Sequence, residues 1–197
     1  CKLKTTVLTA MVAAMAAAAY GGQVGIRITK TAKAPVIDGK LTDACWQNQT
    51  PLDNFTLNNL HASPAKKQTK AYICYDDKNI YVAIRCHEPN MARISAGYTE
   101  SDRDNKFLWG NDCVEVFISR KVGVYYQLLL TAGNALLDIK YNYKTGEDGY
   151  VLGGYSEAKS DYSWNCKGVK NAIHKGKDHW SAELSIPLSQ IGGATKP

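Results

Sequence analysis

The sequence lacks the short motifs that mark common catalytic sites. It contains no HExxH, no GxSxG, no P-loop and no GxGxxG after an expected strand. These motifs supply the metal ligands, the nucleophile or the phosphate-binding amides of metalloproteases, hydrolases and nucleotide-binding proteins. Their absence favours a function without catalysis.

Asp112 and Glu115 are close enough in sequence to suggest a general acid and base. Both fall in an expected strand, where residues three apart point to opposite faces. Two such carboxylates do not converge on one bond unless a bulge intervenes. The pair therefore gives no support for a hydrolase.

Long apolar runs are also scarce, and the main neutral run covers residues 7–19. At about 1.5 Å per helical residue, this run falls short of a bilayer core of about 30 Å. Lys2 and Lys4 precede it, and small alanines end it. We interpret residues 1–19 as an export signal, residues 20–33 as a linker and residues 34–197 as the folded domain, without a membrane span. The expected location is secreted, periplasmic or cell-surface.

Arginine is rare, with five among the 24 basic residues. Removal of residues 1–19 leaves 22 basic and 18 acidic side chains, a net charge of +4. Nucleic-acid-binding proteins usually cluster their basic residues and favour arginine forks. Here the densest basic group is Lys66, Lys67 and Lys70. The charge therefore predicts a solvated surface and no nucleic-acid partner.

CxxC pairs are absent, which removes the usual signal for zinc ribbons and thioredoxin-type redox sites. Five cysteines follow the expected export signal, so at least one thiol stays unpaired in a monomer. Cys45, Cys74 and Cys113 each lie in an apolar string. This setting favours buried cysteines that pack as small hydrophobic residues. A disulfide between two of these cysteines is also compatible with the sequence, because the spacing does not assign partners.

What the sequence does contain is a series of short strands separated by turn residues. Residues 68–75 and 80–86 predict a β-hairpin across an Asp-Asp-Lys-Asn connection. Residues 112–119 and 125–131 predict a second pair, and residues 135–139 predict a further strand. Short helical turns are expected only at residues 41–46 and 188–191.

The clearest alternation lies towards the C-terminal end. Trp180, Ala182, Leu184 and Ile186 alternate with polar residues, which predicts one dry face and one wet face. Pro187 ends this strand because it has no amide hydrogen for the ladder. Many short strands without long helices predict an all-β fold, an antiparallel β-sandwich of the immunoglobulin or jelly-roll kind.

Trp109 lies in a polar neighbourhood just before an expected strand. A core tryptophan usually has apolar neighbours at strand period, as Trp180 does, so Trp109 is a candidate exposed ring. Flat rings cover the apolar faces of sugars, and carboxylates or amides bind the hydroxyls. Glu115, on the face opposite Val114 and Val116, is placed to be such an acceptor. The alternative is that Trp109 only caps the edge of the sandwich.

Four segments form an ordered set of motifs. Residues 35–46 read PVIDGKLTDACW, and residues 70–83 form the expected hairpin. Residues 109–118 read WGNDCVEVFI, and residues 180–188 read WSAELSIPL. The set covers residues 35–192 and resembles the family 9 carbohydrate-binding modules. The third segment is similar to their W-x-x-D-x-V-E-x-F signature, and the fourth to their late strand that ends in Ile-Pro.

This resemblance implies a non-catalytic, glycan-binding β-sandwich in an exported protein, often attached to a glycoside hydrolase. Trp109 would form one wall of an aromatic sandwich around the sugar, and Glu115 would accept hydrogen bonds from hydroxyls. Asn111 and Gln127 complete the expected ligand-binding residues. The partner would be an oligo- or polysaccharide. Some family members also hold structural calcium ions, and no other cofactor is expected.

The sequence departs from the family pattern at two points. Sugar-binding members usually have Arg and then Asn in the strand after the signature, where this chain has Leu129 and Thr131. A second stacking tryptophan is expected in strands beyond residue 197, so we expect a C-terminally incomplete domain. Two other functions stay open: an accessory sandwich of a cell-envelope protein with a degenerate sugar site, and a redox or enzymatic domain with haem at His87 and Met91.

Overall fold

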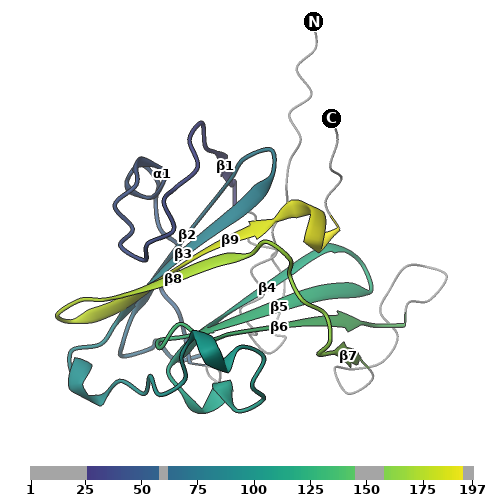
Figure 1. Cartoon of the computed structure of the whole chain (residues 1–197). Helices are drawn as coiled ribbons and strands as arrows, with labels where there is room; N and C mark the ends of the chain where they lie inside the picture. The colour runs from purple at the N-terminus through teal and green to yellow at the C-terminus, as the bar shows by residue number, and fades with distance from the viewer. Residues whose placement is uncertain (1–25, 58–61, 145–157, 193–197) are drawn as a thin grey trace, which may run out of the picture.

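The computed structural model describes residues 26–57, 62–144 and 158–192. The described residues form two stacked β-sheets with almost no helix (Figure 1). The predicted β-sandwich is therefore confirmed. The expected export signal lies outside the described residues, as do residues 20–25 of the expected linker. No helix in the described part of the chain is long and apolar enough to cross a membrane.

The first sheet has five strands in the order β1-β2-β3-β9-β8. Their bounds are β1 (Thr29–Lys30), β2 (Thr69–Tyr75), β3 (Asn79–His87), β8 (Lys170–Lys175) and β9 (His179–Pro187). β1 runs parallel to β2, and all the other pairs are antiparallel. The β2–β3 hairpin is the one that the sequence predicts. β1 lies inside the segment expected to be a linker.

The second sheet has four strands in the order β4-β5-β6-β7, all antiparallel. Their bounds are β4 (Cys113–Lys121), β5 (Val124–Thr131), β6 (Leu136–Asn142) and β7 (Lys159–Asp161). The segment between β3 and β4 contains three short 3-10 turns: η1 (Met91–Arg93), η2 (Glu100–Asp102) and η3 (Leu108–Gly110). The remaining helical elements are α1 (Ala44–Gln47) and η5 (Leu188–Ile191), close to the two expected turns.

The main core lies between the facing sides of the two sheets. Alternate residues of each strand point into it because the side-chain period of a strand is two. The contributing residues include Ile73, Val82, Ile84 and Leu184 from the first sheet and Val114, Leu128, Leu130 and Leu136 from the second. The opposite faces of both sheets therefore need another cover or must face solvent.

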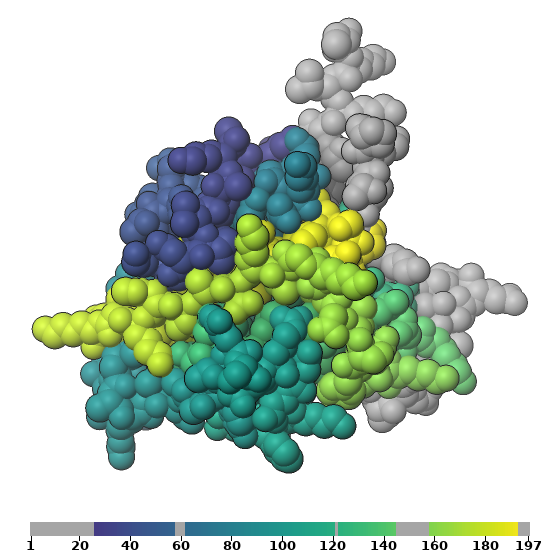
Figure 2. All heavy atoms as spheres, in the orientation of Figure 1, coloured from purple at the N-terminus to yellow at the C-terminus, as the bar shows by residue number. Residues whose placement is uncertain are grey.

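The second face of β9 corrects one sequence prediction. Ser181, Glu183 and Ser185 were expected on a wet face, but all three are buried. The segment that contains α1 covers this side of the five-stranded sheet, and Figure 2 shows its atoms (purple) at the surface there. It packs on the sheet through a small cluster that includes Leu41 and Trp46.

Glu183 fixes that segment by accepting three hydrogen bonds. One oxygen accepts the backbone N–H of Asp38 at 2.8 Å and that of Gly39 at 2.7 Å. The other accepts the indole N–H of Trp46 at 2.8 Å. Burial raises the pKa of Glu183, and the three donors oppose that shift. A 0% exposed carboxylate is tolerated here because it is fully partnered.

Gly39 is required at its position for two reasons. Its φ of +81° lies in the left-handed region, and an added Cβ would lie 2.5 Å from the backbone nitrogen of His174. Its carbonyl also accepts a 2.6 Å hydrogen bond from the Ser181 hydroxyl. The Asp-Gly pair therefore lets the backbone approach β8 and β9 closely.

Replacement of the central acceptor should destabilise the whole domain. We expect Glu183→Ala to lower the free energy of unfolding by about 3 kcal/mol, because two buried donors and one partly buried donor lose their acceptor. Glu183→Gln should lower the free energy of unfolding less than Glu183→Ala, because the amide keeps one oxygen as an acceptor. It should still destabilise the domain, because its NH2 group faces a donor. Chemical denaturation with fluorescence detection measures both. Glu100→Ala, at an exposed glutamate, serves as the control, and a loss in Glu183→Ala no larger than in this control would contradict the prediction.

Candidate functional site

Trp109 lies on η3, the turn that leads into β4. Its neighbour Leu108 is fully buried against Leu129 and Leu137 on the outer face of the four-stranded sheet. Leu108 thus fixes the turn, while the indole of Trp109 remains 40% exposed. The sequence prediction of a solvent-accessible ring is confirmed; its contact with a ligand stays a prediction.

Asn111 directly follows the turn and is half-buried. Its side-chain oxygen accepts the backbone N–H of Gly97 at 2.8 Å, with a longer contact of 3.5 Å to that of Tyr98. Asp112 accepts the N–H of Ser95 at 2.7 Å. These two side chains hold the preceding loop against the start of β4. The structure therefore gives Asn111 a positioning role for the loop beside Trp109.

Glu115 points away from the main core, as the alternation of β4 predicts. Val114 is buried in the core, and Glu115 is exposed on the opposite face. Directly across the ladder it faces Leu129 of β5, the residue that packs under Leu108. The carboxylate is therefore on the same face of the sheet as the turn that holds Trp109.

Gln127 is buried, with 4% of its surface exposed. Its amide N–H donates to the carboxylate of Glu115, and its amide oxygen accepts a 2.8 Å hydrogen bond from the hydroxyl of Tyr141. Burial raises the pKa of Tyr141 to about 12, so this hydroxyl remains a donor at neutral pH. Gln127 thus orients Glu115. In this series of hydrogen bonds, the carboxylate of Glu115 is the exposed end.

An aromatic stack continues the same face beyond Gln127. The rings of Tyr125 and Tyr141 stack with centroids 4.4 Å apart and an angle of 13° between their planes. Tyr143 stacks on Tyr125 at 5.5 Å, and Phe117 lies tilted at 6.0 Å from it. The sequence analysis missed Tyr141 as a site residue. The alternation of side chains along the strands could have indicated it, because Tyr141 lies directly opposite Tyr125 in the β5–β6 register.

The half-buried Asp76 and the buried Asp138 are engaged with protein groups. Asp76 accepts the backbone N–H groups of Lys78 and Asn79, both at 2.7 Å, and the hydroxyl of Tyr81 at 2.6 Å. Arg103 pairs with the buried carboxylate of Asp138 at 2.7 Å. In the described residues, no group of three or more His, Cys, Asp or Glu side chains could hold a metal ion.

A comparison with protein families adds to this geometry. The model of the family described as carbohydrate family 9 binding domain-like matches residues 37–197. The chain belongs to this family. The resemblance that the four sequence segments carry is thereby confirmed, since three of those segments lie wholly inside the match and the first lies largely inside it.

Two solved structures of a family 9 carbohydrate-binding module from Caldicellulosiruptor kristjanssonii are similar to this family 9 domain. Both are 16% identical in sequence and match 82% of this chain. The complex with glucose has a TM-score of 0.48 over 68% of its chain, and the complex with cellotriose has 0.50 over 67%. At this identity the likeness bears on the fold alone. Among curated proteins, none gives a significant match.

Two positions where this family 9 domain departs from the expected pattern are closed to solvent. Leu129 and Thr131 stand where Arg and Asn were expected, and both are fully buried. The Thr131 hydroxyl accepts the backbone N–H of Ala135 at 3.0 Å and donates to the carbonyl of Tyr98 at 3.3 Å. Neither side chain offers a hydrogen-bond donor to solvent. Glu115, across the ladder from Leu129, is an exposed polar group on the same face.

The hydrogen bonds through Gln127 predict a measurable coupling. We expect Gln127→Met and Tyr141→Phe each to lower the free energy of unfolding by about 1–2 kcal/mol. Tyr141→Phe leaves the buried amide oxygen of Gln127 without its donor, and Gln127→Met leaves the half-buried hydroxyl of Tyr141 without its acceptor. The double variant should lose less than the sum of the two, since the second change removes the group that the first orphaned. Urea denaturation of the four proteins measures the coupling energy. Strict additivity would contradict a shared network.

Proposed function

We propose that this family 9 domain binds carbohydrate without catalysis, with Trp109 as the stacking surface and Glu115 as the hydroxyl acceptor. The observation that supports this most directly is that a partly exposed indole lies on a turn packed on the same sheet face as an exposed, hydrogen-bonded carboxylate. Sugars present an apolar C–H face and a fringe of hydroxyls, which these two groups complement. Membership of the family described as carbohydrate family 9 binding domain-like supports the same ligand class.

The proposal includes export of the protein. Residues 1–19 have the basic start, the short apolar run and the small terminal residues of an export signal. The domain would then act outside the cytoplasm, in the periplasm, at the cell surface or in the medium, where polysaccharides are found. A larger parent polypeptide would give the module an enzyme or envelope protein to direct to the glycan.

Removal of the exposed ring tests the proposal. We expect Trp109→Ala to weaken binding of oligosaccharides such as cellotriose by about tenfold to a hundredfold, since burial of an aromatic side chain contributes about 1.5–3 kcal/mol. Isothermal titration calorimetry and retention on insoluble glycan measure the loss. Circular dichroism should show an unchanged fold.

Phe107 provides a matched control for this experiment. It is 73% exposed in the same loop, two residues before Trp109. Phe107→Ala removes a large exposed ring without touching the indole or Glu115, so it should keep the affinity of the unmodified protein. Equal affinities for Trp109→Ala and the unmodified protein would overturn the assignment.

The acceptor gives a second, independent test. We expect Glu115→Gln to weaken glycan binding by about tenfold, because a hydrogen bond to a charged group contributes about 1.5–3 kcal/mol and the amide retains part of it. Glu100→Gln, at an exposed glutamate of the neighbouring loop, should bind as before. Affinity measured by calorimetry for both variants decides this, and a Glu115→Gln protein with full affinity would remove Glu115 from the site.

An accessory sandwich with a degenerate sugar site is the second candidate. The buried Leu129 and Thr131 favour it, because they leave no donor where sugar-binding relatives are expected to have two. A glycan array separates the candidates: binding at micromolar concentration supports the sugar-binding module, and no binding across the array supports the accessory domain.

A further inference from the structure

Two cysteines from distant parts of the sequence meet on the outer face of the five-stranded sheet. Cys45 belongs to α1, and Cys74 belongs to β2. The two side chains lie close enough that each thiol affects the pKa of the other. Cys74 is buried in the small cluster with Trp46 and Tyr81, and the half-buried Cys45 packs against the same cluster. The contact is therefore held by packing on both sides.

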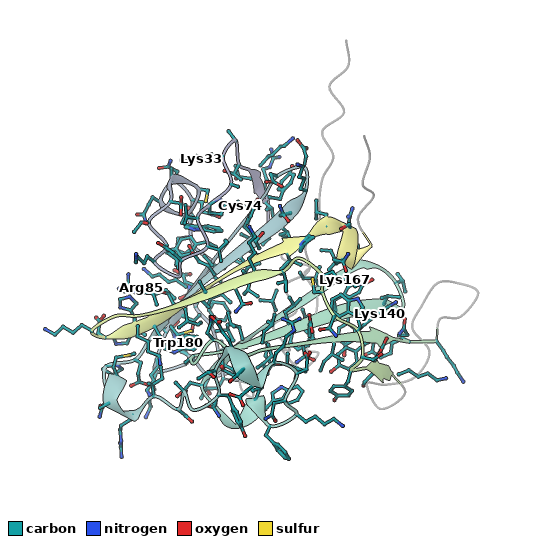
Figure 3. The ribbon with its side chains drawn as sticks, in the orientation of Figure 1. Lys33, Cys74, Arg85, Lys140, Lys167 and Trp180 are labelled. Carbon is teal, nitrogen blue, oxygen red and sulfur yellow. The ribbon has the colours of Figure 1, made fainter. Side chains whose placement is uncertain are left out.

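The pair also lines a cavity of about 380 Å³. Its wall is formed by residues 29–33 and by residues around α1, including Asp43, Asn48 and Gln49. Figure 3 labels two residues of this wall, Cys74 on β2 and Lys33 on the segment beside it. The mixed polar lining and the half-buried Cys45 give a small solute a route to the thiols.

The other described cysteines lack this arrangement. The thiol of Cys86 bonds to Thr69, and Cys113 and Cys166 lie near carboxylates. Cys86 and Cys113 also lie near each other, but they pack against different apolar clusters, the main core and the outer cluster of the four-stranded sheet. Packing has thus brought one pair together, and a disulfide requires close approach of this kind.

We propose that Cys45 and Cys74 form a disulfide that fastens α1 to β2, with a low-molecular-weight disulfide such as oxidised glutathione as the oxidant. The Cys45 thiolate attacks one glutathione sulfur and releases the first glutathione thiol. The Cys74 thiolate then attacks the Cys45 sulfur of this mixed disulfide and releases the second. Two protons leave the cysteines, and two electrons reduce the glutathione disulfide.

The surroundings of the thiols set the rate of this exchange. Burial raises the pKa of Cys45, and the carboxylates of Asp43 and Glu183 raise it further. Burial raises the pKa of Cys74 still more, with contributions from Asp76 and Asp43. Because the thiolate is the attacking species, oxidation is slow at neutral pH and faster under mildly alkaline conditions.

The disulfide would stabilise the covering segment directly. It closes a loop over residues 46–73, and a loop of this length restricts the unfolded chain considerably. It also lies next to Trp46, whose indole binds Glu183. The covalent bond would therefore strengthen the attachment that the Glu183 hydrogen bonds provide.

The test compares the full chain before and after incubation with oxidised glutathione at mildly alkaline pH. Peptide mapping under non-reducing conditions should find one cross-linked peptide that joins Cys45 to Cys74. The melting temperature should rise by roughly 5–10 °C on oxidation and fall back when dithiothreitol is added. Both readings use the native sequence, so they do not depend on a variant that fails to fold.

Two variants complete the test. Cys45→Ser, at a half-buried position, should fold and lose the rise in melting temperature, whereas Cys113→Ser, on the other sheet, should keep it. The proposal is overturned if Cys45 and Cys74 both remain open to alkylation in the oxidised protein. It is equally overturned if Cys45 stops at the glutathione adduct or if the cross-link joins other cysteines.

Discussion

The hydrogen bonds accepted by Glu183 are the constraint on which the rest of the structure depends. This buried carboxylate joins the segment that precedes β2 to β9, an inner strand that pairs with both β3 and β8. It explains in physical terms why Asp38-Gly39 and Trp46 occur together near the start of the domain, because each supplies a donor to the same side chain. A buried charge with three donors specifies one position for the segment, whereas apolar packing alone would permit several.

The candidate site follows the same principle on the other sheet. Glu115 is exposed, but its orientation is fixed by the buried Gln127, which is in turn fixed by Tyr141. Trp109 is exposed on a turn that the buried Leu108 holds in place. In both cases a buried partner orders the group that reaches solvent. A ligand would therefore meet groups that are already ordered, which reduces the entropy cost of binding.

The local patterns predicted the strands and their pairing well, because alternation and turn residues are encoded over a few positions. They gave the β2–β3 hairpin, the β4–β5 pair and the exposed ring of Trp109. They failed at Glu183, where alternation assigned a wet face: its cover comes from residues 38–46, far away in the sequence. The burial of Gln127 was hidden for the same reason, since its partner Tyr141 is supplied by the register of a neighbouring strand. Strand parity reveals such partners only after the register is known.

The domain has a layered arrangement that separates its two candidate chemistries. The main core lies between the sheets, and each sheet carries a smaller apolar cluster on its outer face. The thiol pair belongs to the outer cluster of the five-stranded sheet, and Leu108, beneath Trp109, belongs to that of the four-stranded sheet. The proposed disulfide and the candidate ligand surface therefore lie on opposite outer faces of the sandwich, with the main core between them. The proposed disulfide would thus stiffen one outer face and leave the opposite face free for the proposed ligand.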